Sequence, residues 1–532
     1  MNFLKDKFFL VILLFITIFF MQGIFSLPVL DRDEARFATA SKTMLETQEF
    51  IDIKMQEETR YKKPIGIYWA QSFSNYILGN YPYDKIWVYR IPSLMGIILS
   101  FLLVYKFLQS IYSREVGLLS VFFLTLSFLT ISEIHQAKTD GMLFLFITLC
   151  NILTIKATIE SGLKIHFRLL YWISMAFGIL IKGPIILIFT IFPLFGLSIV
   201  KKKNFFKFIW TKMGFLIFLL ISIPWFVLIS IKSNGLFWHE SVINDLFNKV
   251  KSGQESHGFI PGYYTLLIFL FFWPGSIFLP SFFINLKKKF NEYFIQDNTN
   301  CFLILCFFLP FILYEIIPTK LPHYVFPSYA ALSILISKEI ITSKFSPSLL
   351  KYAFLPTVIF PISILSGITF VIHEYSSFDE TFFFLVVILS TLFFILVYFF
   401  KKKKVKQILF VSSIHQVFIY LVAVYYLVPH LNSFWIAKNM NQVIDKYAGV
   451  VDEVIHFGFN EPSLIFLTSH KAKKNKINKN ENNKKILYLI EQDFENSEIK
   501  SNKLSNFKLV DEIEGFNYSQ GKTKLIKVYA NF

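Results

Sequence analysis

The first polar segment of the chain gathers acidic and basic side chains directly after an apolar run. Its sequence is Asp31-Arg32-Asp33-Glu34-Ala35-Arg36-Phe37-Ala38. Lys62 and Lys63 follow, directly before Pro64. Charged side chains beside a membrane carry a desolvation cost unless they are paired or hydrated, so such a cluster generally marks a functional site. We therefore expect acid and base chemistry at a membrane surface.

Other polar motifs interrupt the later apolar runs. They are Lys138-Thr139-Asp140, Lys182-Gly183-Pro184 and Thr319-Lys320-Leu321-Pro322-His323-Tyr324. The polar loop 239–264 adds His239, Glu240 and His257 as candidates. A plain hydrated loop is the alternative there, and Lys320 and Tyr324 could instead be interfacial anchors.

Each of the three leading candidates also has a structural explanation. Asp33 could cap the N-terminus of a helix, where aspartate is favoured. Lys63 could extend its amine to the membrane interface from an aromatic environment. Asp140 could be held by a pair with Lys138 or His135, because a lone acid at a span is costly. The residue types alone leave these alternatives open.

The composition indicates a membrane protein that crosses the bilayer many times. Hydrophobic residues make up 54% of the 532 positions. The net charge of +17 comes largely from clusters such as 201–203, 287–289 and 401–404, which adjoin apolar runs. Such clusters are typical of cytoplasmic anchors, so we expect no nucleic-acid partner. Cys150, Cys301 and Cys306 fall inside apolar runs, so neither a disulfide framework nor a CxxC metal site is expected.

Apolar windows predict about 13 transmembrane helices. They lie near 8–27, 88–109, 115–134, 141–157, 168–182, 184–200, 213–231, 263–285, 301–317, 324–340, 352–373, 381–400 and 408–428. The first run is longer than a signal-peptide core, so we expect a retained helix. With a cytoplasmic N-terminus, alternation places the three lysine clusters inside, as the positive-inside rule requires. The same alternation places every polar motif above on the outer face.

The chain is predicted to have two parts. Residues 1–428 form the transmembrane domain, with short interfacial helices over 34–46 and 65–78. Residues 429–532 are more polar and predict a small soluble α/β domain on the outer face. Its expected elements are a helix over 433–447 and strands over 454–459, 485–490 and 524–529.

Taken in order, the motifs resemble those of the bacterial aminoarabinose (lipid A) transferase and protein O-mannosyltransferase group, which are GT-C membrane glycosyltransferases. The resemblance covers roughly residues 1–430, and a C-terminal outer domain also fits. It implies a polytopic inner-membrane enzyme whose active site and C-terminal domain are periplasmic. Such an enzyme moves a sugar, with inversion, from a polyprenyl phosphate to lipid A, another envelope glycan or lipid, or a protein.

The resemblance also implies roles for the candidate residues. Asp33 matches the catalytic carboxylate, and Arg36, three residues on, would hold it ionised. Asp140 matches a second carboxylate of the site. Lys63, with Lys62 beside it, matches the lysine that binds the lipid phosphate. Two further residues, Lys320 and Tyr324, are assigned to binding of the donor phosphate. The candidates in the loop that covers the site are His239, Glu240 and His257.

Two further expectations concern a metal and the alternative class of protein. The aminoarabinose branch usually has a glutamate where this chain has Lys62, so a divalent metal is doubtful and no cofactor is assigned. The alternative to an enzyme is a transporter or lipid-binding scaffold. Transporters place ionisable residues near the middle of the membrane in repeated, broken helices. The gathering of charges on one face, without a repeat, favours the enzyme.

Overall fold

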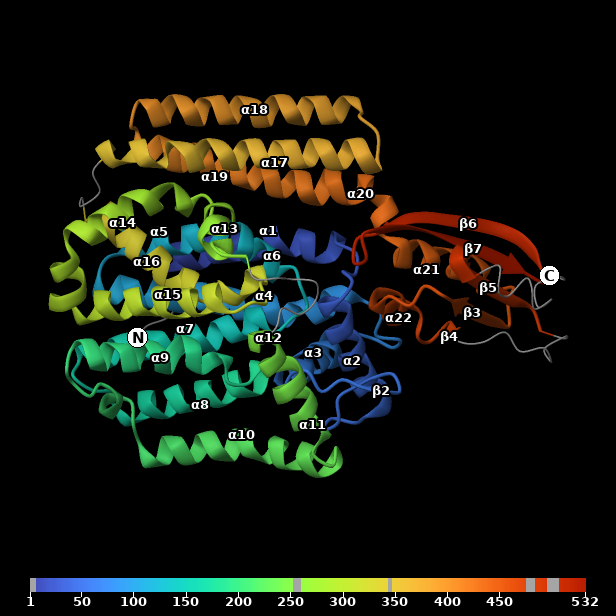
Figure 1. Cartoon of the computed structure of the whole chain (residues 1–532), viewed down its shortest axis with the longest axis horizontal. Coiled ribbons are helices and arrows are strands. Elements are labelled where there is room, and N and C mark those ends of the chain that lie inside the picture. Colours follow the sequence, from blue (N-terminus) through green and yellow to red (C-terminus); the bar gives the residue numbers. More distant parts are fainter. Residues whose placement is uncertain (1–5, 252–259, 343–346, 475–483, 495–506) are drawn as a thin grey trace.

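The structure, a computed structural model, describes residues 6–251, 260–342, 347–474, 484–494 and 507–532. Helices packed side by side form a long bundle, and a small sheet extends from one end of it (Figure 1). The helices α17, α18 and α19 form one side of the bundle, and α8 and α10 form the opposite side.

Within the described residues, nine helical spans are long and apolar enough to cross a membrane. Six of them are the single helices α1 (Lys7–Ser26), α4 (Ile86–Ile111), α7 (Asp140–Ile159), α8 (Ile165–Lys182), α10 (Lys212–Lys232) and α15 (Asn298–Ile316). The seventh begins at Leu349 in the 3-10 helix η6 (Pro347–Ala353) and continues through α17 (Phe354–Tyr375), and the eighth is α18 (Glu380–Lys401). The ninth is α19 (Val405–Val422) continued by η7 (Ala423–Leu427) and α20 (Val428–His430). The protein is therefore a multi-pass membrane protein.

Four shorter segments explain why this number differs from the predicted 13. The pair α5 (Arg114–Leu126) and α6 (Phe128–Ile134) is bent by 68°. The pair formed by α13 (Tyr263–Phe271) and η3 with α14 (Gly275–Lys288) is bent by 118°. Counting each pair as one span raises the number in the described part to 11. The remaining two predicted spans correspond to α9 (Ile185–Val200), a shorter apolar helix, and to α16 (Ser328–Ile341), which has 14 residues. Every predicted span contains a helix, while the number 13 itself stays a prediction.

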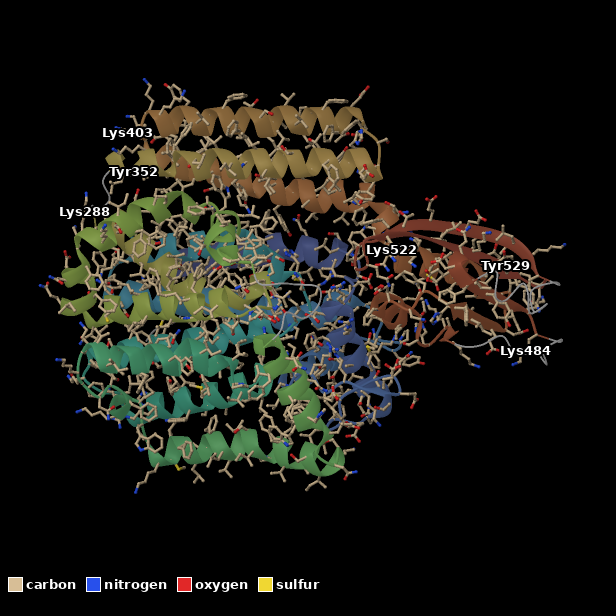
Figure 2. The ribbon with its side chains drawn as sticks, viewed as in Figure 1. Lys288, Tyr352, Lys403, Lys484, Lys522 and Tyr529 are labelled. Atoms are coloured by element: carbon tan, nitrogen blue, oxygen red, sulfur yellow. The ribbon has the colours of Figure 1, made fainter. Side chains whose placement is uncertain are left out.

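The outer surface of the bundle suits a lipid environment. On α18, Phe383, Phe384 and Phe394 are between 60% and 68% exposed, which water would penalise and lipid would not. Figure 2 shows Lys288 and Lys403 at the end of the bundle remote from the sheet. Two of the predicted lysine clusters thus share one end.

Short elements cover the end of the bundle that faces the sheet (Figure 1). They are α2 (Asp33–Thr47), β1 (Lys54–Met55), β2 (Glu58–Thr59), α3 (Gly66–Leu78), α11 (Leu236–Trp238), the π-helix η2 (His239–Phe247), α12 (Asn248–Lys251) and the 3-10 helix η5 (Pro322–Val325). The predicted interfacial helices correspond to α2 and α3. However, α2 does not present its lysine to water: Lys42 is 0% exposed and donates to the carbonyl of Phe466 at 3.0 Å, because the C-terminal part covers it.

The C-terminal part is a mixed sheet with helices packed on it. Its elements are α21 (Ile436–Tyr447), β3 (Glu453–Phe457), α22 (Pro462–Thr468), β4 (Lys473–Lys474), β5 (Ile486–Glu491), β6 (Lys508–Asn517) and β7 (Lys522–Ala530). Within the described residues the strand order is β4-β3-β5-β7-β6, parallel from β4 to β5 and antiparallel from β5 to β6. Met440 and Ile444 of α21 pack with Leu487, Leu489 and Val528 in its core. The predicted helix and three strands match α21, β3, β5 and β7.

Candidate active site

A cavity of about 370 Å³ lies where α2, the start of α7, the α8–α9 turn, η2 and η5 meet. Among the described residues it is lined by three carboxylates and by six cationic side chains. The carboxylates are Asp33, Asp140 and Asp245, and the cations are Arg60, Lys62, Lys63, Lys138, Lys182 and Lys249. Cations therefore exceed carboxylates, which makes the cavity attractive to an anion.

Asp33 is placed in this cavity by the ion pair of its neighbour, Glu34. Glu34 is 1% exposed, and both of its oxygens accept from Arg90 of α4, at 2.8 Å each. The same two oxygens accept from the backbone N–H groups of Leu30 and Ala137, at 2.9 and 2.8 Å. This network joins the start of α2 to α4 and to the segment before α7. The carboxylate of Asp33, one residue earlier, is thereby directed to the cavity.

The Asp33 carboxylate is ionised but accepts no hydrogen bond from the described residues. Burial alone would raise its pKa, but the positive charges of Lys138 and Arg60, with a smaller contribution from Lys63, bring its pKa below the usual range. An ionised carboxylate that faces an open cavity is available to a ligand. It can orient or deprotonate an attacking group.

Arg36 does not have the place that its spacing predicted. It is absent from the cavity lining, and the cations that act on Asp33 are those named above. The electrostatic partner of Arg36 is Asp31 instead. The main cations that act on Asp33 are therefore Lys138 and Arg60 in place of the predicted Arg36.

Asp140 pairs with Lys182, not with Lys138 or His135. Lys182 Nζ lies 2.6 Å from Asp140 Oδ1, and the Thr139 hydroxyl donates to the other oxygen at 3.2 Å. Lys182 ends α8, and the chain turns back there through Gly183, whose φ of 65° suits glycine. The Lys182 amine also lies 5.8 Å from the centre of the Tyr324 ring. Tyr324 lines the cavity, and its contact with the donor stays a prediction.

Lys63 is one end of a three-membered charge cluster. Its Nζ lies 2.5 Å from Asp245 Oδ2, and Lys249 Nζ lies 2.8 Å from Asp245 Oδ1. Burial would raise the pKa of Asp245, but the two lysines lower it to about 2. Lys62 is exposed and also lines the cavity. Lys63 and Lys62 therefore occupy the same cavity as Asp33.

Three predicted residues do not line the cavity in the described structure. The Lys320 amine donates to the carbonyls of Tyr314, at 2.8 Å, and Glu315, at the C-terminal end of α15. His239 and Glu240 are exposed, 3.6 Å from one another, and are absent from the lining. His257 lies outside the described residues.

The described residues contain no group of three or more His, Cys, Asp or Glu side chains that could hold a metal ion. Two charged cavity residues, Arg60 and Asp245, were not singled out from the sequence, whereas Lys249 belongs to the loop 239–264 that was. The i, i+4 spacing of Asp245 and Lys249 is a signal that indicates their pairing. Nothing in the sequence indicates that Lys63 joins them from 182 residues away.

Comparisons with known proteins show which families this chain resembles. Residues 62–228 match the family described as dolichyl-phosphate-mannose-protein mannosyltransferase. The undecaprenyl phosphate-alpha-4-amino-4-deoxy-L-arabinose arabinosyl transferase 2 of Proteus mirabilis (strain HI4320) is 26% identical over 315 residues, 58% of this chain and 54% of that protein. The transferase of the same name, without the numeral, from Photorhabdus laumondii subsp. laumondii is 23% identical over 311 residues, again 58% and 54%.

A solved structure extends the likeness to the whole chain. The crystal structure of ArnT from Cupriavidus metallidurans bound to undecaprenyl phosphate matches with a TM-score of 0.74 and 13% sequence identity, covering 99% of this chain and 98% of that one. The chain is similar to the GT-C aminoarabinose transferases. The resemblance predicted from the motifs is thereby confirmed, as is the ArnT-like GT-C fold. In sequence, the chain spans about half the length of the curated relatives that it matches.

Proposed function

We propose that this protein is a membrane glycosyltransferase that moves a sugar from a polyprenyl phosphate to an acceptor, with inversion at the anomeric carbon. The observation that carries the proposal is the cavity in which Asp33, ionised and facing open space, lies among an excess of cations. A carboxylate can activate the attacking group while cations stabilise the phosphate that leaves. The names of the curated relatives, which include undecaprenyl phosphate, support this donor class.

The wall of the cavity supports a lipid-linked donor. Ile185, Ile188 and Phe189 of α9 line it beside the charged groups. A prenyl chain can lie against such apolar side chains while its phosphate meets Lys63. A nucleotide sugar has no prenyl chain that would pack against these apolar side chains.

Each charged group then has a role in the reaction. Asp33 orients the acceptor and accepts its proton. Lys63 and Lys62 bind the phosphate of the donor. Asp140, held by Lys182 and near Tyr324, positions the sugar from the other side of the cavity. The bond from the anomeric carbon to the phosphate oxygen breaks, and its electron pair stays with the phosphate.

The proposal also includes the class of acceptor and the orientation of the protein in the membrane. Lipid A or another envelope glycan or lipid is the acceptor that the motif resemblance to the aminoarabinose (lipid A) transferases implies. The family matched by residues 62–228 makes a protein acceptor the second candidate. We place the enzyme in the bacterial inner membrane, with the cavity and a soluble domain of residues 429–532 in the periplasm. The lysines at the far end of the bundle, such as Lys288 and Lys403, support a cytoplasmic position for that end (Figure 2).

A donor panel tests the proposal. Purified protein receives radiolabelled polyprenyl-phosphate sugars, or nucleotide sugars, together with an envelope extract. We expect free polyprenyl phosphate and one labelled acceptor fraction, and nothing from nucleotide sugars. Transfer from a nucleotide sugar alone would overturn the donor class, and no transfer from any donor would favour a transporter or lipid-binding scaffold.

A further inference from the structure

We propose that Asp245 sets the charge of the phosphate subsite to favour the donor phosphodiester over the phosphomonoester left after transfer, and so promotes release of the spent lipid. This inference rests on the proposed function. Asp245 would then be a specificity-determining residue that acts through the lysines it contacts.

The first step is the geometry of the cluster. Asp245 is 7% exposed, and each of its oxygens contacts a different lysine, Lys63 at 2.5 Å and Lys249 at 2.8 Å. The backbone of Lys249 is held in place by Thr319, whose hydroxyl donates a hydrogen bond to the Lys249 carbonyl at 3.0 Å. All three charged groups line the cavity. A phosphate that reaches Lys63 must therefore share its ammonium group with Asp245.

The second step compares charges. Two lysines and one aspartate leave the cluster with one net positive charge. A sugar linked through a phosphodiester carries one negative charge, whereas the free phosphomonoester carries about −1.5 to −2 at pH 7. The cluster thus matches the donor and leaves the product under-compensated. Lys62 also faces the cavity, but it is exposed, so water screens its charge.

The third step follows the charge through the reaction. The acceptor forms a bond to the anomeric carbon, and its proton passes to Asp33. The bond to the phosphate oxygen breaks, and the oxygen keeps the electron pair. The phosphate gains its second negative charge at this moment, close to the carboxylate of Asp245. Repulsion between these two anions then favours departure of the lipid phosphate.

The test uses Asp245→Asn, which keeps the size of the side chain and removes its charge. We expect inhibition by added undecaprenyl phosphate to become stronger by about tenfold, equal to about 1.4 kcal/mol, with a smaller change in the donor KM and a lower kcat. The matched control is Glu160→Gln. Glu160 directly follows α7 and pairs with Lys156 at the same i, i+4 spacing, outside the cavity. It should leave both constants unchanged.

Two further measurements separate a charge effect from damage to the fold. The double variant Asp245→Asn with Lys249→Gln restores one net positive charge and should return the ratio of product inhibition constant to donor KM toward that of the wild type. The effect of Asp245→Asn should also shrink at pH 5, where the phosphomonoester carries about one charge because its second pKa is about 6. Asp245 itself stays ionised there, since its pKa is about 2. Lys182 is the other cation that faces Lys63.

Burial lowers the pKa of His323 well below its usual value, so this nearby ring stays neutral over the same range. Equal changes in donor and product affinity, or no rescue by the double variant, would overturn the inference. Wild-type protein that transfers no sugar would instead overturn the proposed function.

Discussion

Glu34 and Arg90 form a buried ion pair in which two guanidinium nitrogens donate to two carboxylate oxygens, each at 2.8 Å. Arg90 also donates to the carbonyls of Ile24, Leu27 and Pro28, which end α1 and lead into α2. The two adjacent acids of the first motif therefore have different functions. Glu34 fixes the fold of the junction, and Asp33 is left free to face the cavity.

Arg90→Met is expected to destabilise the protein by about 3 to 5 kcal/mol, because it leaves Glu34 buried without its partner. Thermal unfolding in detergent measures the change. The matched control is Arg114→Gln, since Arg114 is 46% exposed and lies 3.6 Å from Asp6. That variant should cost less than about 1 kcal/mol. Equal stability of the two variants would contradict the structural role of the pair.

Asp31→Asn is expected to stabilise the protein at pH 7.5. Burial raises the pKa of Asp31 from 3.8 to about 6, while its carboxylate accepts from the backbone N–H of Ser463 in the C-terminal part, at 3.1 Å. An acid with a raised pKa favours folding when protonated, so wild-type stability should fall as the pH rises from about 4 to 6, by at most about 3 kcal/mol. The free energy of unfolding of Asp31→Asn should not show this decrease between pH 4 and pH 6. If the stabilities of the wild type and Asp31→Asn differ by the same amount at pH 4 and at pH 7.5, Asp31 does not cause the pH dependence.

Sugar transfer is expected to be insensitive to EDTA. Lys62 and Lys63 both line the cavity, and an ammonium group repels a divalent cation while it attracts an anionic phosphate. Activity is measured with and without chelator, followed by single divalent ions. Loss of activity that one ion restores would show that a metal is required.

Single cysteines test the orientation. Glu240→Cys and Lys446→Cys should react with a membrane-impermeant reagent from outside, because both side chains are exposed and lie on the predicted periplasmic face. Lys202→Cys, in one of the lysine clusters, should react after lysis alone. The native Cys150, Cys301 and Cys306 are buried, so their background should be low. Labelling of residue 446 that requires lysis would place the C-terminal part in the cytoplasm.

Much of the site follows from the sequence because membrane topology restricts where polar motifs can go. Asp33, Lys63 and Asp140 line one cavity, although they come from three separate segments. Alternation of the spans is enough to predict that they share a face. It does not predict the direction in which each side chain points.

The structure differs from the sequence-based predictions where tertiary contacts determine the position of a side chain or a strand. Lys320 donates hydrogen bonds to backbone carbonyls at the C-terminal end of α15, which have no partner within the helix. The sequence of the Lys320 motif does not indicate this contact. Asp245 acquires its role from Lys63, far away in sequence. Strand β6 was missed because it is largely exposed and carries Asp511, Glu512 and Glu514 in place of a clear alternation.

The most direct test of the account is the turnover of Asp33→Asn with a polyprenyl-phosphate sugar. The substitution keeps the shape of the side chain and removes the charge that faces the cavity, so the normally inserted variant should transfer sugar roughly 10²–10⁴-fold more slowly. Asp31→Asn, two residues away and directed at the C-terminal part, should keep near-wild-type turnover at its best pH. Near-wild-type transfer by Asp33→Asn would contradict the central claim that this carboxylate carries the reaction.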